Sequence, residues 1–205
     1  MSTSSAVQLL ESDLHPDPLI QFTRWLDEAV AANVPLPHAM TLATASRDGL
    51  PSARVVLLKN LEKGGFTFVT NYESRKGLEL AENPRAALVF YWAGMGRQVR
   101  AEGLVEEVSA EESDALFAAR PRDNQLSSAA SHQSQVTTLA ELDLRYEELK
   151  RQYEGHTIPR PPRWGGYRVL PERMEFWQHR FARMNDRIEY LRGPGGEWTI
   201  RRLAP

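Results

Sequence analysis

Cationic and amide side chains recur at the edges of apolar segments along this chain. They occur in Arg54-Val-Val-Leu-Leu-Lys59, Ser74-Arg75-Lys76, Arg97-Gln98-Val99, Arg120-Pro-Arg122-Asp123, Gln133-Ser134, Glu175-Phe-Trp-Gln178 and Arg183-Met-Asn-Asp-Arg187. Arginine and lysine bind phosphate through charge-assisted hydrogen bonds, so the pattern favours a site for a small phosphorylated molecule. The formal charge of the chain is only -2, which does not favour a polyanion such as nucleic acid as a partner.

Ser74-Arg75-Lys76 has the clearest chemistry of these stretches. A serine N-cap, free backbone N–H groups, the positive end of a helix dipole and two cations together could form a phosphate pocket. A solvated first turn of a helix has the same composition, and the stretch alone does not separate the two. Arg54 to Lys59 leaves a similar choice, because its charges could simply mark where a barrel strand reaches water.

Two amides and one indole could recognise a flat heterocycle. Gln98 and Gln133 could each bond a ring carbonyl or nitrogen, and Trp177 could supply a wall beside the ring. Each is equally compatible with a surface amide or a core tryptophan. The sequence has no Gly-x-Ser-x-Gly, Walker loop or Gly-x-Gly-x-x-Gly, and its five histidines show no paired helical spacing. Hydrolase, nucleotidase, Rossmann and metal-site hypotheses therefore lose support.

The elements that must position these residues fit a single domain. The chain has 205 residues, is 41% hydrophobic and contains no cysteine, so no disulfide framework or thiolate chemistry is available. Residues 1–16 are mostly polar and predict a flexible N-terminal arm, with one domain over residues 17–205. No apolar run reaches the roughly 20 residues that a membrane span needs, and no secretory signal is evident, so we expect a cytoplasmic protein.

Hydrophobic periodicity predicts helices and antiparallel strands. Asp17-Pro18 begins a helix whose apolar face is Leu19, Phe22, Trp25, Leu26, Ala29 and Val30, and further helices begin at Ser74, at the capping box Ser109-Ala-Glu-Glu112 and at Thr138-Leu-Ala-Glu141. Strands are expected over 40–46, 52–59, 66–70, 86–92, 98–108, 167–170, 174–178, 187–191 and 198–203. The fold class is α+β, mainly antiparallel β: a barrel with helices packed around it.

Taken in order, these segments resemble the pyridoxamine 5′-phosphate oxidase family, FMN enzymes of vitamin B6 metabolism. The resemblance runs from about Asp17 to Pro205. Its most specific pieces are Arg54-Val-Val-Leu-Leu-Lys59, Ser74-Arg75-Lys76, Arg120-Pro-Arg-Asp123, Trp164-Gly-Gly-Tyr-Arg168, Glu175-Phe-Trp-Gln178 and Arg202-Leu-Ala-Pro205. It implies an FMN-binding split β-barrel that forms a homodimer with FMN at the subunit interface, and a C-terminal dimerisation and substrate segment at about 164–205.

The resemblance also implies which residues touch the cofactor. Arg75 and Lys76 would grip the FMN phosphate, Arg54 to Lys59 would run along the flavin, and Val69 and Thr70 would line it. The full set of expected contacts is Arg54, Val55, Val56, Leu57, Leu58, Lys59, Val69, Thr70, Arg75, Lys76, Gln98, Gln133, Ser134, Trp177 and Arg187.

On the substrate side, the resemblance implies Lys59, Arg120, Asn124, Arg183 and Asn185 as contacts, with Arg183 and Asn185 in catalytic positions. This side departs from the family pattern. Leu116 and Asn124 stand where tyrosine and serine are usual, and Asn185 stands where histidine is usual. The N-terminal arm also lacks the usual Arg-Arg-x-Tyr-like stretch. An amide forms hydrogen bonds but does not titrate as imidazole does.

The implied reaction is oxidation of pyridoxine 5′-phosphate or pyridoxamine 5′-phosphate to pyridoxal 5′-phosphate, with O2 as acceptor and H2O2 as product, plus ammonia from the amine. Two alternatives remain. The departures at positions 116, 124 and 185 fit a flavin oxidase of the same fold that acts on another reduced heterocycle, such as a dihydrophenazine precursor. Asn185 alone would also fit a non-catalytic protein that binds flavin or pyridoxal phosphate.

Overall fold

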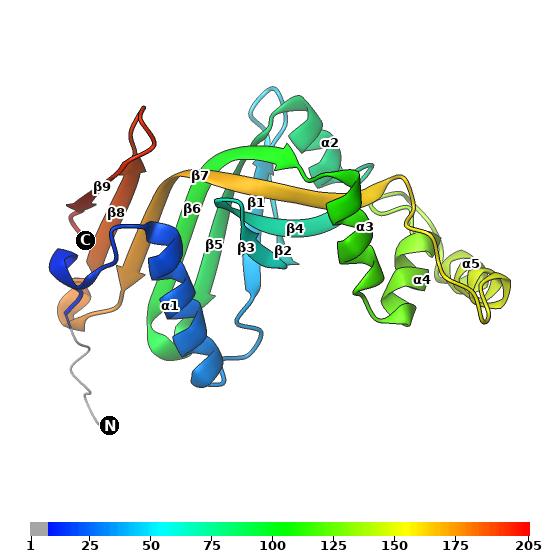
Figure 1. Cartoon of the computed structure of the whole chain (residues 1–205), viewed down its shortest axis with the longest axis horizontal. Coiled ribbons are helices and arrows are strands. Elements are labelled where there is room, and N and C mark those ends of the chain that lie inside the picture. Colours follow the sequence, from blue (N-terminus) through cyan, green and yellow to red (C-terminus); the bar gives the residue numbers. More distant parts are fainter. Residues whose placement is uncertain (1–7) are drawn as a thin grey trace.

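One curled antiparallel sheet forms the body of the protein, and the computed structural model describes residues 8–205 of it (Figure 1). The strands are β1 (Ala39–Ala45), β2 (Pro51–Leu57), β3 (Asn60–Glu62), β4 (Gly65–Asn71), β5 (Arg85–Trp92), β6 (Arg97–Glu107), β7 (Trp164–Gln178), β8 (Asp186–Arg192) and β9 (Trp198–Arg202). Their order is β2-β1-β5-β6-β7-β4-β3, and β8 pairs with β7 and β9. The predicted α+β, mainly antiparallel fold is confirmed.

Five α-helices pack around the sheet in the described part of the chain: α1 (Pro18–Ala31), α2 (Arg75–Glu82), α3 (Ala110–Ala118), α4 (Arg122–Ala130) and α5 (Leu139–Gln152). In Figure 1, α3, α4 and α5 lie at one end of the molecule, and β8, β9 and the C-terminus lie at the other. No helix among residues 8–205 has the length and apolar character that a membrane span requires.

The first helix begins where the sequence predicts. The Asp17 carboxylate accepts the Leu19 N–H at 2.8 Å, and Phe22 is fully buried against the rings of Phe66, Phe90 and Trp92. Val30, predicted on the apolar face, is 47% exposed, whereas the adjacent Ala29 is fully buried, so Val30 lies at the edge of that face. The helix otherwise closes the open side of the main core.

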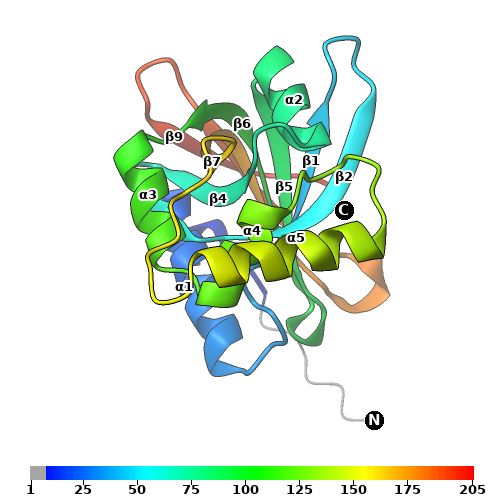
Figure 2. The same cartoon turned by 90° about the vertical axis from the view of Figure 1, so that its right-hand side faces the viewer.

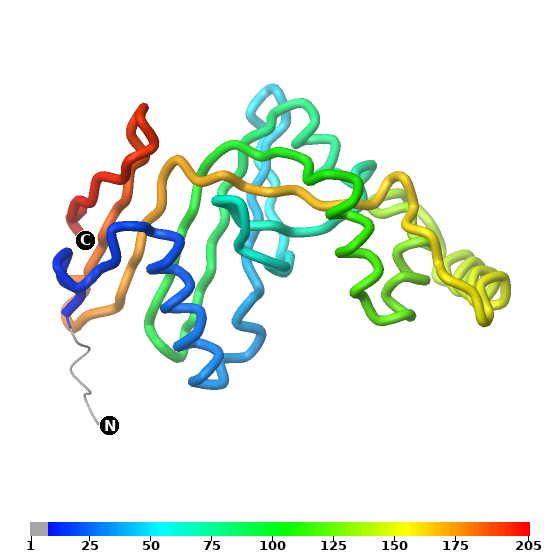
Figure 3. Tube along the Cα trace, viewed as in Figure 1, coloured from blue at the N-terminus to red at the C-terminus, as the bar shows by residue number. Residues whose placement is uncertain are grey.

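The strand β7 is one continuous element, and the prediction of two separate strands, 167–170 and 174–178, is wrong. Pro171 falls in the predicted gap, but it lies opposite Gly103 at a register shift, a position where a strand tolerates proline. From Tyr167 to Gln178, β7 pairs with β6. Its first half also pairs with β4 and its second half with β8, so this strand spans both ends of the molecule (Figure 3).

The helix α4 was not predicted from the sequence. Its N-cap, Pro121, has no side chain that can cap, and the segment has no regular apolar period. Packing holds it in place, because Leu126 joins Phe117, Ile158 and Trp164 in a second buried cluster. Figure 2 shows α5 crossing in front of α4, and the capping box predicted at Thr138 and Glu141 is present at its start.

Residues of the predicted N-terminal arm contact the folded domain. Leu9 and Leu14 are buried in the main core, and the Leu9 N–H donates to the Asp186 carboxylate of β8 at 3.1 Å. Arg202 of β9 donates to the Leu9 carbonyl. The remainder of the predicted arm, residues 1–7, lies outside the described residues. The folded domain thus includes residues that the polar composition assigned to the arm.

Candidate functional site

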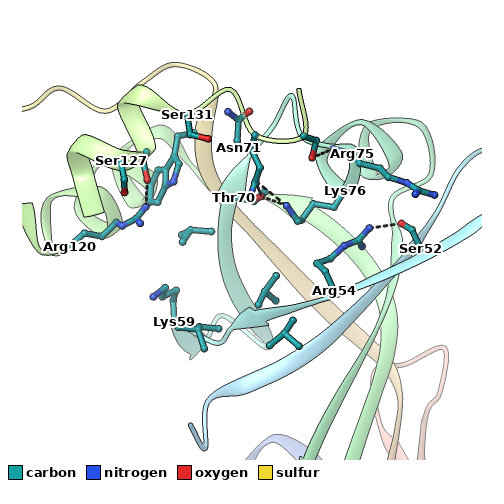
Figure 4. A pocket seen from close by; sticks show the side chains of 18 of the residues that line it. Ser52, Arg54, Lys59, Thr70, Asn71, Arg75, Lys76, Arg120, Ser127 and Ser131 are labelled. Atoms are coloured by element: carbon teal, nitrogen blue, oxygen red, sulfur yellow. Dashed lines mark hydrogen bonds between the residues drawn. The ribbon is translucent and has the colours of Figure 1, made fainter. Parts of the chain in front are cut away.

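A cavity of 820 Å³ opens between β2, β4, the first turn of α2, α4 and the segment that follows α4 (Figure 4). Its size is within the range of small-molecule sites in proteins, about 300–1,000 Å³. Its lining includes twelve predicted site residues: Arg54, Val55, Val56, Leu57, Lys59, Val69, Thr70, Arg75, Lys76, Arg120, Gln133 and Ser134. Five of these are cations, and none of the described residues that line the cavity is a carboxylate, so the cavity suits an anionic ligand.

At one end of the cavity, Lys76 is held by three neutral oxygen atoms. Its Nζ donates to Thr70 Oγ1 at 3.0 Å, to Gln133 Oε1 at 3.0 Å and to Ser74 Oγ at 3.2 Å. Burial lowers the pKa of Lys76 to about 8, and the charge of Arg54 contributes in the same direction. Lys76 therefore has no carboxylate hydrogen-bonded to it, and its charge is available to a bound anion.

Local sequence explains why α2 begins at this end. Ser74 caps the helix by accepting the Gly77 N–H, and Gly77 lies so close to Tyr72 that a Cβ would be 2.0 Å from the Tyr72 carbonyl oxygen. The Arg75 N–H donates to Ser134 Oγ at 3.2 Å. The helix N-terminus, with its partial positive charge, is thus fixed at the wall of the cavity.

The other end of the cavity holds a second pair of cations, Lys59 and Arg120 (Figure 4). The Arg120 guanidinium donates to Ser128 Oγ at 2.8 Å and lies over the Trp164 ring at 5.0 Å from its centroid. Burial lowers the pKa of Lys59, and the nearby charge of Arg120 lowers it further. Burial also lowers the pKa of Arg120. Neither cation has a carboxylate partner among the contacts of the described residues, so both can bind an anion.

An apolar stretch separates the two cationic ends. Val56, Leu57 and Val69 line it from β2 and β4, and Leu57 is 45% exposed although it is a large apolar residue. A ligand with a flat apolar body and a charged group at each side would match this division. The two cationic ends could bind one ligand that has two anionic groups, or two ligands that each have one anionic group.

The predicted site residues did not include Ser127, Ser128, Ser131, Asn71 or Trp164, all of which line the cavity, although Trp164 lies in a stretch that carries the family resemblance. Ser127 and Ser131 are four residues apart, which places them on one face of a helix. That spacing is visible in the sequence, but it indicates a shared face only if the segment is known to be a helix, and α4 was not predicted. Ser52 and Ala53 of β2 complete the lining.

The remaining predicted residues do not line the cavity of the same chain. They are Leu58, which is buried in the main core, Asn124, which is exposed on α4, and Gln98, Trp177, Arg183, Asn185 and Arg187. Leu116, noted as a departure, packs against the second buried cluster. The predicted site residues thus fall into two groups in one chain.

The second group forms a row across the other half of the sheet. Gln98 of β6 pairs with Trp177 of β7, which pairs with Arg187 of β8. The Arg187 guanidinium donates to both oxygens of Glu175, at 2.8 and 3.0 Å. A bidentate ion pair of this kind fixes the direction of the guanidinium.

The turn that precedes β8 is strained. Ala182 and Arg183 have φ angles of 57° and 62°, in the left-handed region that residues with a Cβ rarely adopt. The Asn185 side-chain oxygen accepts the Arg180 N–H at 3.0 Å and braces the turn. Strain of this kind persists where the surroundings impose it, often at functional sites.

Comparison with known proteins gives a consistent assignment. Residues 26–156 match the family described as "Pyridoxamine 5'-phosphate oxidase", and residues 164–205 match "Pyridoxine 5'-phosphate oxidase C-terminal dimerisation region". A protein of Cupriavidus necator named pyridoxine/pyridoxamine 5′-phosphate oxidase is 56% identical over 198 residues, which are 96% of this chain and 93% of that protein. One of Bordetella petrii with the same name is 55% identical over 197 residues, again 96% and 93% of the two chains.

Two solved structures are similar in fold. PhzG from Burkholderia lata, crystallised with tetrahydrophenazine-1-carboxylic acid, has a TM-score of 0.92 and 35% identity, and the match covers 98% of this chain and 100% of PhzG. A pyridoxamine 5′-phosphate oxidase-related, FMN binding protein from Nostoc punctiforme has a TM-score of 0.75 and 16% identity, covering 92% and 97% of the two chains. The second likeness bears on the fold alone.

The cationic cavity predicts binding of inorganic phosphate. We expect phosphate to raise the Tm of the flavin-free protein above its value in chloride at equal ionic strength, because a ligand of the folded state stabilises it by about 1.4 kcal/mol at tenfold its Kd. Lys76→Met should lose most of this gain. Lys150→Met, at an exposed position of α5 outside the cavity, should keep it. An equal gain in both variants would place phosphate binding elsewhere.

Proposed function

This chain belongs to the pyridoxamine 5′-phosphate oxidase family, and we propose that it binds FMN and oxidises pyridoxine 5′-phosphate and pyridoxamine 5′-phosphate to pyridoxal 5′-phosphate. O2 is the proposed acceptor, and H2O2 is the product, together with ammonia from the amine. Relatives that are 53–56% identical over nearly the whole chain and carry this oxidase name support the proposal.

The single observation that carries the proposal is the pairing of two cationic ends in one cavity. FMN and a phosphorylated B6 vitamer are both flat heterocycles with one phosphate each. Arg75 and Lys76 suit the FMN phosphate, and Lys59 and Arg120 suit the phosphate of the substrate. The residues present therefore fit the group that the family implies. The chemistry that FMN supplies when bound is two-electron oxidation of the substrate, with return of the electrons to O2.

The protein contributes position and charge. Ser128 and Trp164 hold the Arg120 guanidinium, so its remaining N–H groups face the cavity before the substrate binds. The side chain then loses little conformational freedom on binding. Lys59 adds a second charge beside it. These two cations would fix the substrate by its phosphate and leave its ring over the apolar stretch at Val56 and Val69.

Arg183 and Asn185 remain proposed as the substrate contacts on the far side of the ring. The amide of Asn185 would hold the substrate by hydrogen bonding alone, since it does not titrate. Arg183 would supply a fixed positive charge at the pyridine face.

A homodimer accounts for the two groups of predicted residues. Gln98, Trp177, Arg183 and Arg187 would touch the same ligands as the cavity, yet they do not line it in their own chain. A second copy can place its own row against the cavity of the first, and symmetry then gives two equal sites. The match of residues 164–205 to a dimerisation region supports this arrangement.

A second candidate is oxidation of another reduced heterocycle. The 35% identity and close structural match to PhzG, together with the departures at Leu116, Asn124 and Asn185, favour it. The relatives with higher identity favour the B6 vitamers. A non-catalytic flavin-binding role has only Asn185 in its favour, and the names of these relatives are those of an oxidase.

The proposal predicts a yellow protein whose flavin absorption bleaches under anaerobic conditions when pyridoxamine 5′-phosphate is added. With O2 present, H2O2 and pyridoxal 5′-phosphate should form in equal amounts. Tetrahydrophenazine-1-carboxylic acid serves as the competing substrate. Bleaching by the phenazine compound but not by either B6 vitamer would establish the second candidate, and absence of flavin binding would contradict both.

The dimeric site predicts complementation between subunits. Arg120→Ala and Arg183→Ala homodimers should each lose most of their turnover. A heterodimer with one subunit of each kind, purified through two different tags, should recover about half of the wild-type turnover, because one of its two sites then contains neither substitution. If both residues serve one site from the same chain, each site of the heterodimer keeps one substitution and no activity returns.

A further inference from the structure

A buried carboxylate, Glu79, lies behind the phosphate end of the cavity and does not line it. It belongs to α2, one turn after Arg75, and is 7% exposed. Its Oε1 accepts a hydrogen bond from Arg75 Nε at 2.9 Å. Its Oε2 faces the sheet and approaches Arg54 Nη2 at 3.4 Å. One carboxylate thus contacts two of the cavity cations, which come from different elements.

Two hydroxyl groups complete the hydrogen bonds of Glu79. Thr44 Oγ1 of β1 and Ser52 Oγ of β2 both donate to its Oε2, at 2.5 and 2.6 Å. Arg54 in turn donates to Thr44 Oγ1 at 2.6 Å and also to Ser52. The same hydroxyls therefore link the carboxylate to Arg54 a second time. A buried charge with this many donors is fixed in place.

The charge state of Glu79 follows from these contacts. Burial alone would raise its pKa, but the hydrogen bonds from Ser52, Thr44 and Arg75 and the charge of Arg54 bring the pKa down to about 2. Glu79 is therefore a full negative charge throughout the neutral range. Such a charge cancels part of the repulsion among cations that lie close together before any anion binds.

Lys76 is the cation whose protonation depends on this balance. The charged groups that act on it are Arg54 from β2, which lowers its pKa, and Glu79 from its own helix, which raises it. The other groups around its Nζ, Thr70 of β4, Ser74 and Gln133, are neutral. Without Glu79, burial and Arg54 would act on Lys76 unopposed.

We propose that Glu79 is a positioning residue for the phosphate end of the cavity: it fixes the side chains of Arg54 and Arg75 and keeps the adjacent Lys76 protonated at neutral pH. The three cations are then arranged before the ligand arrives, which removes most of the ordering cost from the binding step. The inference rests on the proposed FMN site, because it assigns a role toward the FMN phosphate. It adds a residue that touches neither FMN nor substrate.

The direction of the pH effect follows from the sign of the charges. Once the FMN phosphate is fully ionised, its affinity should fall as pH rises through the pKa of Lys76, about 8 in the wild-type protein. Removing the charge of Glu79 moves that pKa downward. The loss of affinity should then begin at lower pH, and a purely structural role would not produce this shift.

The test is titration of the flavin-free protein with FMN between pH 6 and 9, followed by quenching of flavin fluorescence. Glu79→Gln should weaken binding about tenfold at pH 7, as expected for loss of a hydrogen bond between charged groups, and should move the alkaline decline to lower pH. Glu79→Asp keeps the charge and should restore the wild-type pH profile. Glu82→Gln, at an exposed position at the end of the same helix, is the matched control.

A second measurement does not require FMN. Acetylation of Lys76 by acetic anhydride, followed by mass spectrometry in the flavin-free protein, reports its protonation as a function of pH. The midpoint should be lower in Glu79→Gln than in the wild type or Glu82→Gln. If the wild type binds FMN and Glu79→Gln matches Glu82→Gln in affinity, pH profile and midpoint, the role of Glu79 is refuted. If the wild type does not bind FMN, the proposed function fails, and the acetylation midpoints alone decide whether Glu79 controls Lys76.

Discussion

The structure depends on holding five like charges around one cavity. In a common low-dielectric space these cations would repel one another, so other contacts must hold each of them in place. The five are Arg54, Lys59, Arg75, Lys76 and Arg120. The fold supplies the charges from different elements and gives most of them a specific support. Lys76 has three neutral oxygens, Arg120 has Ser128 and Trp164, and Arg54 and Arg75 share Glu79. The cation side chains are therefore held in place, and their positive charge is still available to bind two phosphates.

The long strand β7 connects this cavity to the rest of the predicted site. Its first half pairs with β4, which carries Val69 and Thr70, and its second half carries Trp177 and pairs with β8. One rigid element thus fixes the separation between the cavity and the row of Gln98, Trp177 and Arg187. A separation set in this way cannot be closed within one subunit without breaking the sheet. The proposed dimer would supply the second part from the other subunit, and the match to a C-terminal dimerisation region supports it.

Much of the fold could be predicted from local sequence. The Ser74 cap, the Asp17 cap and the capping box at Thr138 each fix a helix start through contacts within four residues, and each is present. Prediction from local sequence failed where tertiary packing determines the structure. Pro171 is tolerated in β7 because a register shift lies opposite it, and α4 is held by Leu126 rather than by a cap. Neither fact is visible in the residues themselves.

The candidate site divides in the same way. Ser74-Arg75-Lys76 could be predicted as an anion site from its own chemistry. The amide chemistry of Gln133 suggested a contact to a heterocycle, and the family resemblance then assigned that contact to FMN. The role of Glu79 could not be predicted from the sequence. It depends on Thr44, Ser52 and Arg54, which are distant from Glu79 in the sequence and contact it only in the folded protein.

The central claim is that the cations at the start of α2 bind the phosphate of a flavin nucleotide. Comparing FMN with riboflavin by fluorescence titration of the flavin-free protein tests it directly, since the two ligands differ only in the phosphate. We expect tight binding of FMN, far weaker binding of riboflavin, and loss of that difference in Lys76→Met. Equal affinity for FMN and riboflavin in the wild-type protein would contradict it.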